Sequence, residues 1–129
     1  MKKNIALVCV SLFVMAFMPK YQKEPWTVPD KYVKMANPVK ADATSIAEGK
    51  ELYLQHCQSC HGKKGKGDGS KAAQLDTDCG DFTSADFKKL SDGAIFYKTF
   101  EGRKDMPSYK KKIPDQNEIW SLVNYMKTL

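Results

Sequence analysis

The stretch Cys57-Gln58-Ser59-Cys60-His61 contains two thiols separated by two residues and followed directly by a histidine. This spacing is the pattern for covalent haem attachment. Each thiol can add to one vinyl group of a porphyrin, and two intervening residues let the backbone turn so that both sulfurs reach one edge of the flat ring. The next residue is then carried under the iron, where a neutral imidazole nitrogen can bind it. The stretch therefore predicts one covalent haem c held by Cys57 and Cys60, with His61 as a ligand of its iron.

A second iron ligand has to come from elsewhere in the chain. His56 directly precedes the motif, so it cannot readily reach the other haem face, and we expect it to be an exposed helix residue. Met35 lies in a proline-containing segment, and Met126 lies on the apolar face of a predicted helix. Met106 stands in a polar loop, where packing does not explain a lone methionine, and Pro107 stiffens that loop. We predict Met106 as the distal iron ligand.

Two other chemistries use paired cysteines. Zinc could take sulfur and nitrogen ligands from Cys57, Cys60, His61 and Cys79, although adjacent Cys60 and His61 are awkward partners on one tetrahedral ion. A thioredoxin-like dithiol would need a βαβ unit around the motif, and no such pattern surrounds it. Both alternatives fit the sequence less well than haem.

The N-terminal part of the chain differs from the rest in composition. Residues 1–18 carry two lysines and then a short apolar run, which is typical of a secretory signal peptide, with an uncleaved membrane anchor as the alternative. Export suits covalent haem, which is attached outside the cytoplasm. Residues 19–43 contain four prolines and few aliphatic side chains, which favours a tether in extended conformation. The alternative is an arm in which Trp26, Tyr32 and Met35 pack back on the domain.

Residues 44–129 form the predicted domain, and no run in it alternates like a strand. A first helix is expected to begin at Thr44 or Ser45, with Glu48 completing a capping box, and to lead into the haem motif along one face. The other expected helices cover 84–90, 92–101 with Gly102 as its stop, and a last helix with Pro114 in its first turn. The fold class is therefore all-α, and a large buried cofactor would supplement the small apolar core.

Charge and length limit the function classes. A chain of 129 residues suits one domain, and its formal charge of +6 comes from lysines with a single arginine, Arg103. These lysines are scattered rather than gathered in a stripe, so nucleic-acid binding is not expected. The sequence shows no carboxylate pair and no nucleophile–base pair, and we do not predict an enzyme.

Residues 45–129 resemble a class I cytochrome c. Gly49 and Tyr53 match the glycine and the aromatic residue of that family's first helix, and Met106 with Pro107 resembles its distal-ligand loop. The attachment and proximal positions match Cys57, Cys60 and His61, and the last-helix residues that cross the first helix match Leu122 and Tyr125. The family usually has a proline near the proximal histidine, whereas residues 71–81 contain none and Cys79 lies there. The group that bonds the second ring nitrogen of His61 is therefore not indicated.

The resemblance implies a cytochrome c fold, with crossed N- and C-terminal helices and short middle helices around one haem. It implies a monomeric one-electron carrier of a respiratory chain, in the periplasm or tethered to its membrane. Its partners would be redox proteins such as a quinol-oxidising complex or a terminal oxidase or reductase. His/Met ligation raises the reduction potential and leaves the iron no open position for substrate. The alternatives are a membrane-anchored haem subunit of a respiratory complex, and a ligand-binding or peroxidatic haem protein with a labile Met106.

Overall fold

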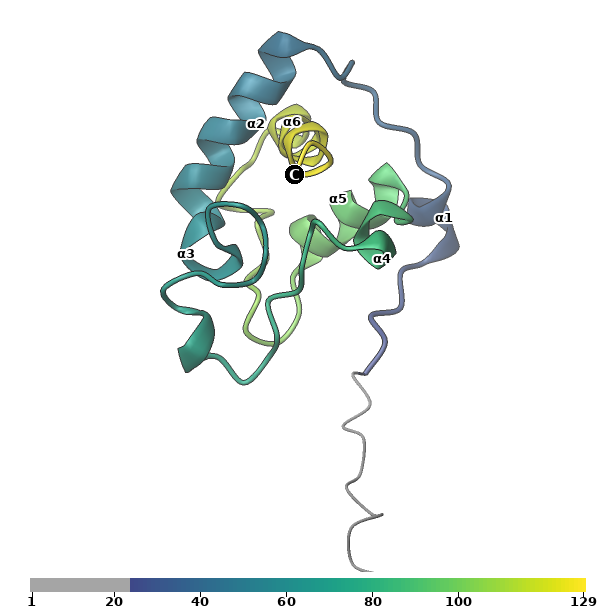
Figure 1. Cartoon of the computed structure of the whole chain (residues 1–129). Coiled ribbons are helices and arrows are strands. Elements are labelled where there is room, and N and C mark those ends of the chain that lie inside the picture. Colours follow the sequence, from purple (N-terminus) through teal and green to yellow (C-terminus); the bar gives the residue numbers. More distant parts are fainter. Residues whose placement is uncertain (1–23) are drawn as a thin grey trace, which may run out of the picture.

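The computed structural model describes residues 24–129, and within this range its regular secondary structure is helical apart from one isolated β-bridge between Arg103 and Met106. The helices shown in Figure 1 are α1 (Asp30–Val33), α2 (Ala43–His56), α3 (Gln58–His61), a 3-10 turn (Ala72–Gln74), α4 (Ala85–Lys88), α5 (Asp92–Glu101) and α6 (Gln116–Met126). The prediction of an all-α domain is confirmed. The predicted leader, residues 1–18, and the start of the predicted tether, residues 19–23, lie outside the described residues.

The two longest helices, α2 and α6, make the principal helix contact of the fold. Figure 1 looks nearly along α6 while α2 runs across the view, so the two helices cross. A Cβ atom placed on Gly49 would lie 2.0 Å from the carbonyl oxygen of Ser121 and 2.9 Å from the Cβ of Tyr125. Only glycine allows this approach of the two backbones, and the expected close helix contact at Gly49 is confirmed.

The start of α2 differs from the sequence prediction. Its N-cap is Asp42, whose carboxylate accepts a hydrogen bond from the Ser45 amide at 3.0 Å, while the Ser45 hydroxyl accepts from the Asp42 amide at 3.2 Å. Ser45 therefore occupies the third helical position of the capping box instead of the cap itself. Glu48, predicted to close the box, instead accepts a hydrogen bond from the Ser121 hydroxyl of α6 at 2.6 Å. Because the Asp42 carboxylate caps the helix, α2 begins earlier than predicted, and the Glu48 carboxylate bonds to Ser121 of α6 instead of closing the box.

The C-terminal half follows its local signals closely. Helix α5 covers the predicted residues and ends at Gly102, which has a φ of 69° that favours glycine. Helix α6 begins later than predicted, because Asp115 caps it by accepting from the Asn117 amide at 2.9 Å. Pro114 therefore precedes the cap and does not lie in the first turn.

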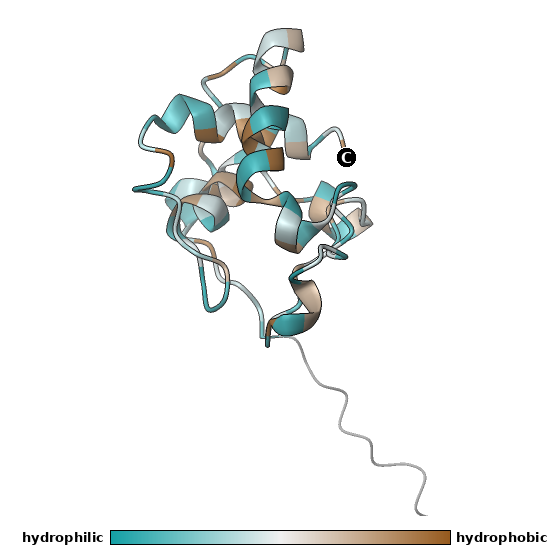
Figure 2. Ribbon diagram, turned by 90° about the vertical axis from the view of Figure 1, so that its left-hand side faces the viewer, coloured by the Kyte–Doolittle hydropathy of each residue, from teal (hydrophilic) through white to brown (hydrophobic). Residues whose placement is uncertain are grey.

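The core lies where α6 packs against α2 on one side and α5 on the other. Figure 2, in which α2 faces the viewer, shows hydrophilic and hydrophobic residues alternating along this helix, and its buried residues are Ser45, Gly49 and Tyr53. The Phe96 ring of α5 stacks on Trp120 of α6 at 4.2 Å between centroids. The largest fully buried side chains are Tyr53, Phe96, Ile113, Ile119, Leu122, Val123 and Ser121.

Residues 24–39, here called the arm, pack on the domain. Helix α1 lies beside α5 (Figure 1), and the Tyr32 ring contacts the Tyr97 ring at 4.7 Å. The Asn37 amide donates a hydrogen bond to the Asn124 side chain of α6 at 2.8 Å. Met35, in contrast, is exposed. The alternative in which Trp26 and Tyr32 pack back therefore describes this segment, and Met35 lies against Gly93 of α5 although it is exposed.

Candidate functional site

One cavity of about 440 Å³ contains all four predicted site residues in its lining: Cys57, Cys60, His61 and Met106. Its apolar walls come mainly from Leu75, Phe82, Phe87, Leu90, Ile95 and Met126. Pockets of this volume are typical of sites for small molecules and cofactors. The structure thus brings together residues that are separated by more than half of the domain's sequence.

The helical turn after α2 places the two thiols. Cys57 ends α2 through an amide hydrogen bond to the Tyr53 carbonyl at 2.9 Å, and α3 then carries the chain through one turn to His61. Residues three apart lie on the same face of a helix, so Cys57 and Cys60 both reach the cavity. The Tyr53 hydroxyl donates to the carbonyl of Gly62 at 2.6 Å, which fixes the end of this turn against α2.

Neither Cys57 nor Cys60 is in a disulfide. Cys57 is 7 % exposed, and this burial raises the pKa of its thiol to about 12, with Cys60 adding to the shift. The Cys57 thiol is therefore protonated at neutral pH. Two free thiols at this spacing are the groups that thioether attachment requires.

Aromatic rings surround His61. The Phe82 ring stacks on the imidazole with centroids 4.6 Å apart, and Phe87 stacks on the other side of Phe82 at 4.5 Å. Burial lowers the pKa of His61, and the backbone of Cys79 opposes this shift. The His61 Nδ1 atom is buried without a hydrogen-bond partner of normal geometry among residues 24–129. The sequence did not single out Phe82, because no spacing pattern links it to a histidine 21 residues earlier.

The remaining sulfur and imidazole groups near the cavity differ in their surroundings. Met106 is half-buried on the turn that follows α5, whereas Met126 is 4 % exposed and belongs to the apolar core, as predicted. His56 was expected to be exposed, which is wrong. It is half-buried because its ring packs edge-on against Tyr109 at 5.9 Å, and Tyr109 also donates a hydrogen bond to the His56 carbonyl at 2.8 Å.

The described part of the chain contains no set of ligands for the zinc site considered as an alternative. Among residues 24–129, no three histidine, cysteine or acidic side chains are close enough to hold one metal ion. Cys79 also lines the cavity, but it does not complete a cluster with the motif.

Residues 44–126 match the protein family described as cytochrome c oxidase, cbb3-type, subunit III. The chain belongs to this cytochrome c family. As a c-type cytochrome it is implied to carry covalent haem c and to take part in electron transfer with other redox proteins. No curated protein matches the sequence at a significant level. None of the helices among residues 24–129 is long and apolar enough to cross a membrane.

Solved structures agree with this family. A c-type cytochrome named KustC0563 is 31 % identical, with a TM-score of 0.53 over 62 % of this chain and 94 % of that one. A chain of the Kuenenia stuttgartiensis reducing HAO-like protein complex Kustc0457/Kustc0458 is 25 % identical, with a TM-score of 0.63. That match covers 84 % of this cytochrome but only 51 % of the Kuenenia chain, so this chain spans about half the length of that relative. The predicted cytochrome c fold is confirmed.

The residues around the cavity fit haem c. The donor set combines two unbridged thiols, an imidazole and a thioether sulfur, and the walls between them are largely apolar. An imidazole whose pKa is lowered by burial is neutral at pH 7, which is the form that binds iron.

Replacing Phe82 tests the role of the aromatic stack beside His61. We expect Phe82→Ala to lower the free energy of unfolding of the haem-bound protein by about 2 kcal/mol, below the range for a fully buried phenylalanine because Phe82 is half-buried. Phe82→Leu keeps most of the volume and should cost less than about 1.5 kcal/mol. Chemical denaturation of both variants and the wild type measures this. Equal stability of all three would mean that the stack does not support His61.

Proposed function

We propose that this cytochrome is a one-electron carrier whose haem is held by Cys57 and Cys60 through thioether bonds and whose iron is bound by His61 and Met106. The observation that carries the proposal is that these four side chains, which belong to the motif turn and to the turn after α5, line the same cavity. Haem c, when bound, supplies a reversible couple between ferric and ferrous iron.

The chain's own residues would keep the iron in one ligation state. His61 is held by its place at the end of α3 and by the Phe82 ring, so its imidazole has little freedom to swing away. The apolar walls exclude water, and a neutral sulfur ligand favours the ferrous form, so both raise the potential. With His61 and Met106 both bound to the iron, no position would be open for substrate, which supports an electron carrier and not an enzyme.

The proposed setting is a respiratory chain in the periplasm. It rests on the secretory pattern of residues 1–18, which either are removed or anchor the protein to the membrane. The proposed partners are redox proteins such as a quinol-oxidising complex or a terminal oxidase or reductase, met by the monomer in short-lived complexes.

A second candidate function is a fixed haem subunit of a redox complex. It is supported by the family description, which names an oxidase subunit, and by the relative found in a protein complex. Under this alternative the same haem site works while the protein stays bound to its partner. Size-exclusion chromatography of the protein from its native membranes separates the two, because a carrier elutes alone.

Expression of the full chain with a haem-attachment system tests the proposed site. We expect haem to remain with the polypeptide after denaturation and the visible spectrum to titrate as one electron. The ferrous protein should bind carbon monoxide slowly, because Met106 has to leave first. Rapid binding of carbon monoxide by the unmodified protein would instead support the ligand-binding or peroxidatic alternative.

A further inference from the structure

The turn that carries Met106 has a fixed backbone. The Arg103 amide donates to the Met106 carbonyl at 2.8 Å, and the Met106 amide donates to the Arg103 carbonyl at 3.0 Å. Lys104, between them, has a φ of 54°, in the left-handed region that few residues other than glycine adopt. A residue persists in this conformation when its surroundings over-determine it. The three residues before Met106 all make contacts outside the turn.

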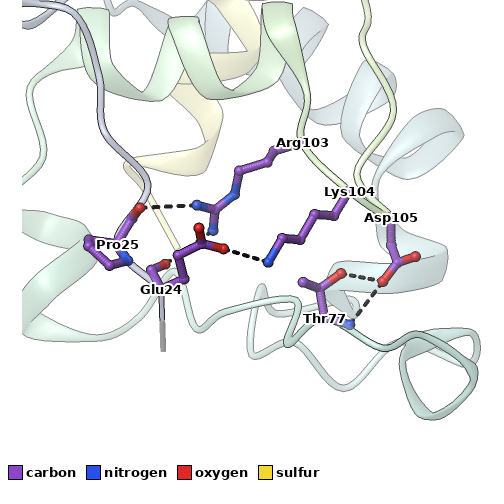
Figure 3. A network of polar contacts seen from close by, with 6 residues as sticks. All are labelled: Glu24, Pro25, Thr77, Arg103, Lys104 and Asp105. Carbon is purple, nitrogen blue, oxygen red and sulfur yellow. Dashed lines mark hydrogen bonds and ion pairs between the residues drawn. The ribbon is translucent and has the colours of Figure 1, made fainter. Parts of the chain in front are cut away.

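The arm holds two of these three residues (Figure 3). The Arg103 guanidinium donates to the carbonyl of Pro25 at 3.1 Å and to that of Glu24 at 3.4 Å. Its central carbon also lies 4.7 Å from the centre of the Trp26 ring, within the range of a cation–π contact. The Lys104 ammonium lies 2.6 Å from a carboxylate oxygen of Glu24. The turn is thus tied to a segment that lies almost 80 residues earlier in the chain.

The third residue is held from another side. A carboxylate oxygen of Asp105 accepts hydrogen bonds from both the hydroxyl and the amide of Thr77, the latter at 2.9 Å (Figure 3). These bonds lower the pKa of Asp105, with the Thr77 hydroxyl as the main cause. Thr77 belongs to the loop that also lines the cavity. Arg103, Lys104 and Asp105 are consecutive, so every residue between Gly102 and Met106 has a partner outside the turn.

The arm can act as a support because it is itself anchored. It crosses α5 at Gly93, where a Cβ atom would lie 1.9 Å from the Tyr32 carbonyl oxygen. Farther along, the Asn124 side chain of α6 receives a hydrogen bond from Asn37 and donates one to the Val39 carbonyl at 3.2 Å. The arm is therefore attached to α5 and to α6, and its first residues reach the Met106 turn from this fixed base.

We propose that the arm and Thr77 position Met106, holding the Arg103–Met106 turn so that the sulfur stays at the haem iron. This inference rests on the proposed function, in which Met106 is the distal ligand. The Glu24 and Lys104 side chains are 68 % and 51 % exposed, and exposed ion pairs add little to global stability. The ties act instead on local opening of the turn, the step that precedes loss of the sulfur. Their removal should therefore speed the opening without unfolding the domain.

Imidazole binding to the ferric holoprotein measures this opening, because imidazole takes the iron position that the sulfur leaves. Arg103→Met removes the guanidinium contacts with Glu24, Pro25 and Trp26 and leaves the Lys104–Glu24 ion pair in place, and Thr77→Val removes the hydroxyl bond to Asp105 with little change of shape. Each should raise the rate of imidazole binding roughly 3- to 10-fold, and the two together should raise it further. Arg103→Lys keeps the charge and should fall between the wild type and Arg103→Met.

Lys127→Met is the matched control. It breaks an ion pair of similar length, 2.7 Å to Asp92, which lies outside the lining of the cavity. We expect wild-type imidazole binding for this variant, and thermal midpoints within a few degrees of the wild type for all of them.

Met106→Ala, measured in the same assay, distinguishes a failure of the proposed support from a failure of the proposed ligation. If Met106→Ala opens the iron while Arg103→Met and Thr77→Val bind imidazole like Lys127→Met, the proposed support is wrong and the ligation stands. If Met106→Ala itself changes neither the spectrum nor imidazole binding, Met106 is not the ligand and both proposals fail. Faster binding in the two support variants, with unchanged control, supports the inference.

Discussion

The Met106→Ala holoprotein is expected to keep its covalent haem and to lose the sixth bond to iron. The proposed thioethers involve Cys57 and Cys60, at the α2–α3 junction, whereas Met106 reaches the cavity from the turn after α5. Loss of the sulfur removes a neutral ligand that favours ferrous iron, so the reduction potential should fall. A fall on the order of 0.1 V is expected, within the roughly 0.8 V range that axial ligands span. Cyanide and carbon monoxide should bind much faster than to the wild type.

Met126→Leu is the control for this variant. Met126 also lines the cavity, but its side chain is packed in the core and a leucine of similar volume replaces it there. Its spectrum, potential and ligand-binding rates should match those of the wild type. A potentiometric titration and stopped-flow mixing decide between the two sulfurs, and an effect on the Met126 variant alone would assign the distal position to α6.

The fold was predictable where the deciding signals are local. Helix α5 has its cap, its apolar spacing and its terminating Gly102 within about a dozen residues, and its bounds agree with the prediction. At the start of α2, several polar residues in succession can each serve as a cap, and the sequence does not rank them. In the structure Asp42 is the cap. Ser45 is buried in the first turn, where its hydroxyl donates to the Lys40 carbonyl at 2.7 Å.

Contacts between segments that are distant in the chain could not be predicted from the sequence. The choice between a tether and an arm depended on Glu24 and Trp26 meeting Lys104 and Arg103, and no periodicity links residues so far apart. The same holds for Phe82 against His61. The motif could be recognised because covalent attachment restricts its residues to one short pattern, whereas packing partners are set by the whole fold. The ligand role of Met106 remains a prediction, and the structure contributes its position in the cavity.

Gly49→Val should give the largest loss of stability among the variants considered. The added Cβ would meet the backbone oxygen of Ser121 at 2.0 Å, and a backbone atom of α6 can move only if the helix moves. Overpacking of this kind costs about 1–3 kcal/mol, and the contact with backbone places this change near the upper end. For a domain of this size the thermal midpoint should fall by roughly 10–20 °C. The proposed ligands, His61 and Met106, lie outside the contact, so the visible spectrum below the transition should be unchanged.

Two further variants show whether the close crossing of α2 and α6 causes the loss of stability in Gly49→Val. Gly49→Ala gains up to about 1 kcal/mol in helix propensity, so a lowered midpoint for this variant can come only from the clash. Ala47→Val puts the same β-branched side chain on an exposed position of α2 and should cost about 0.5 kcal/mol. Thermal unfolding of the three haem-bound variants, followed by circular dichroism, gives the comparison. If Gly49→Val has the same thermal midpoint as Ala47→Val, the stability of the domain does not depend on the close approach of the two helices at Gly49.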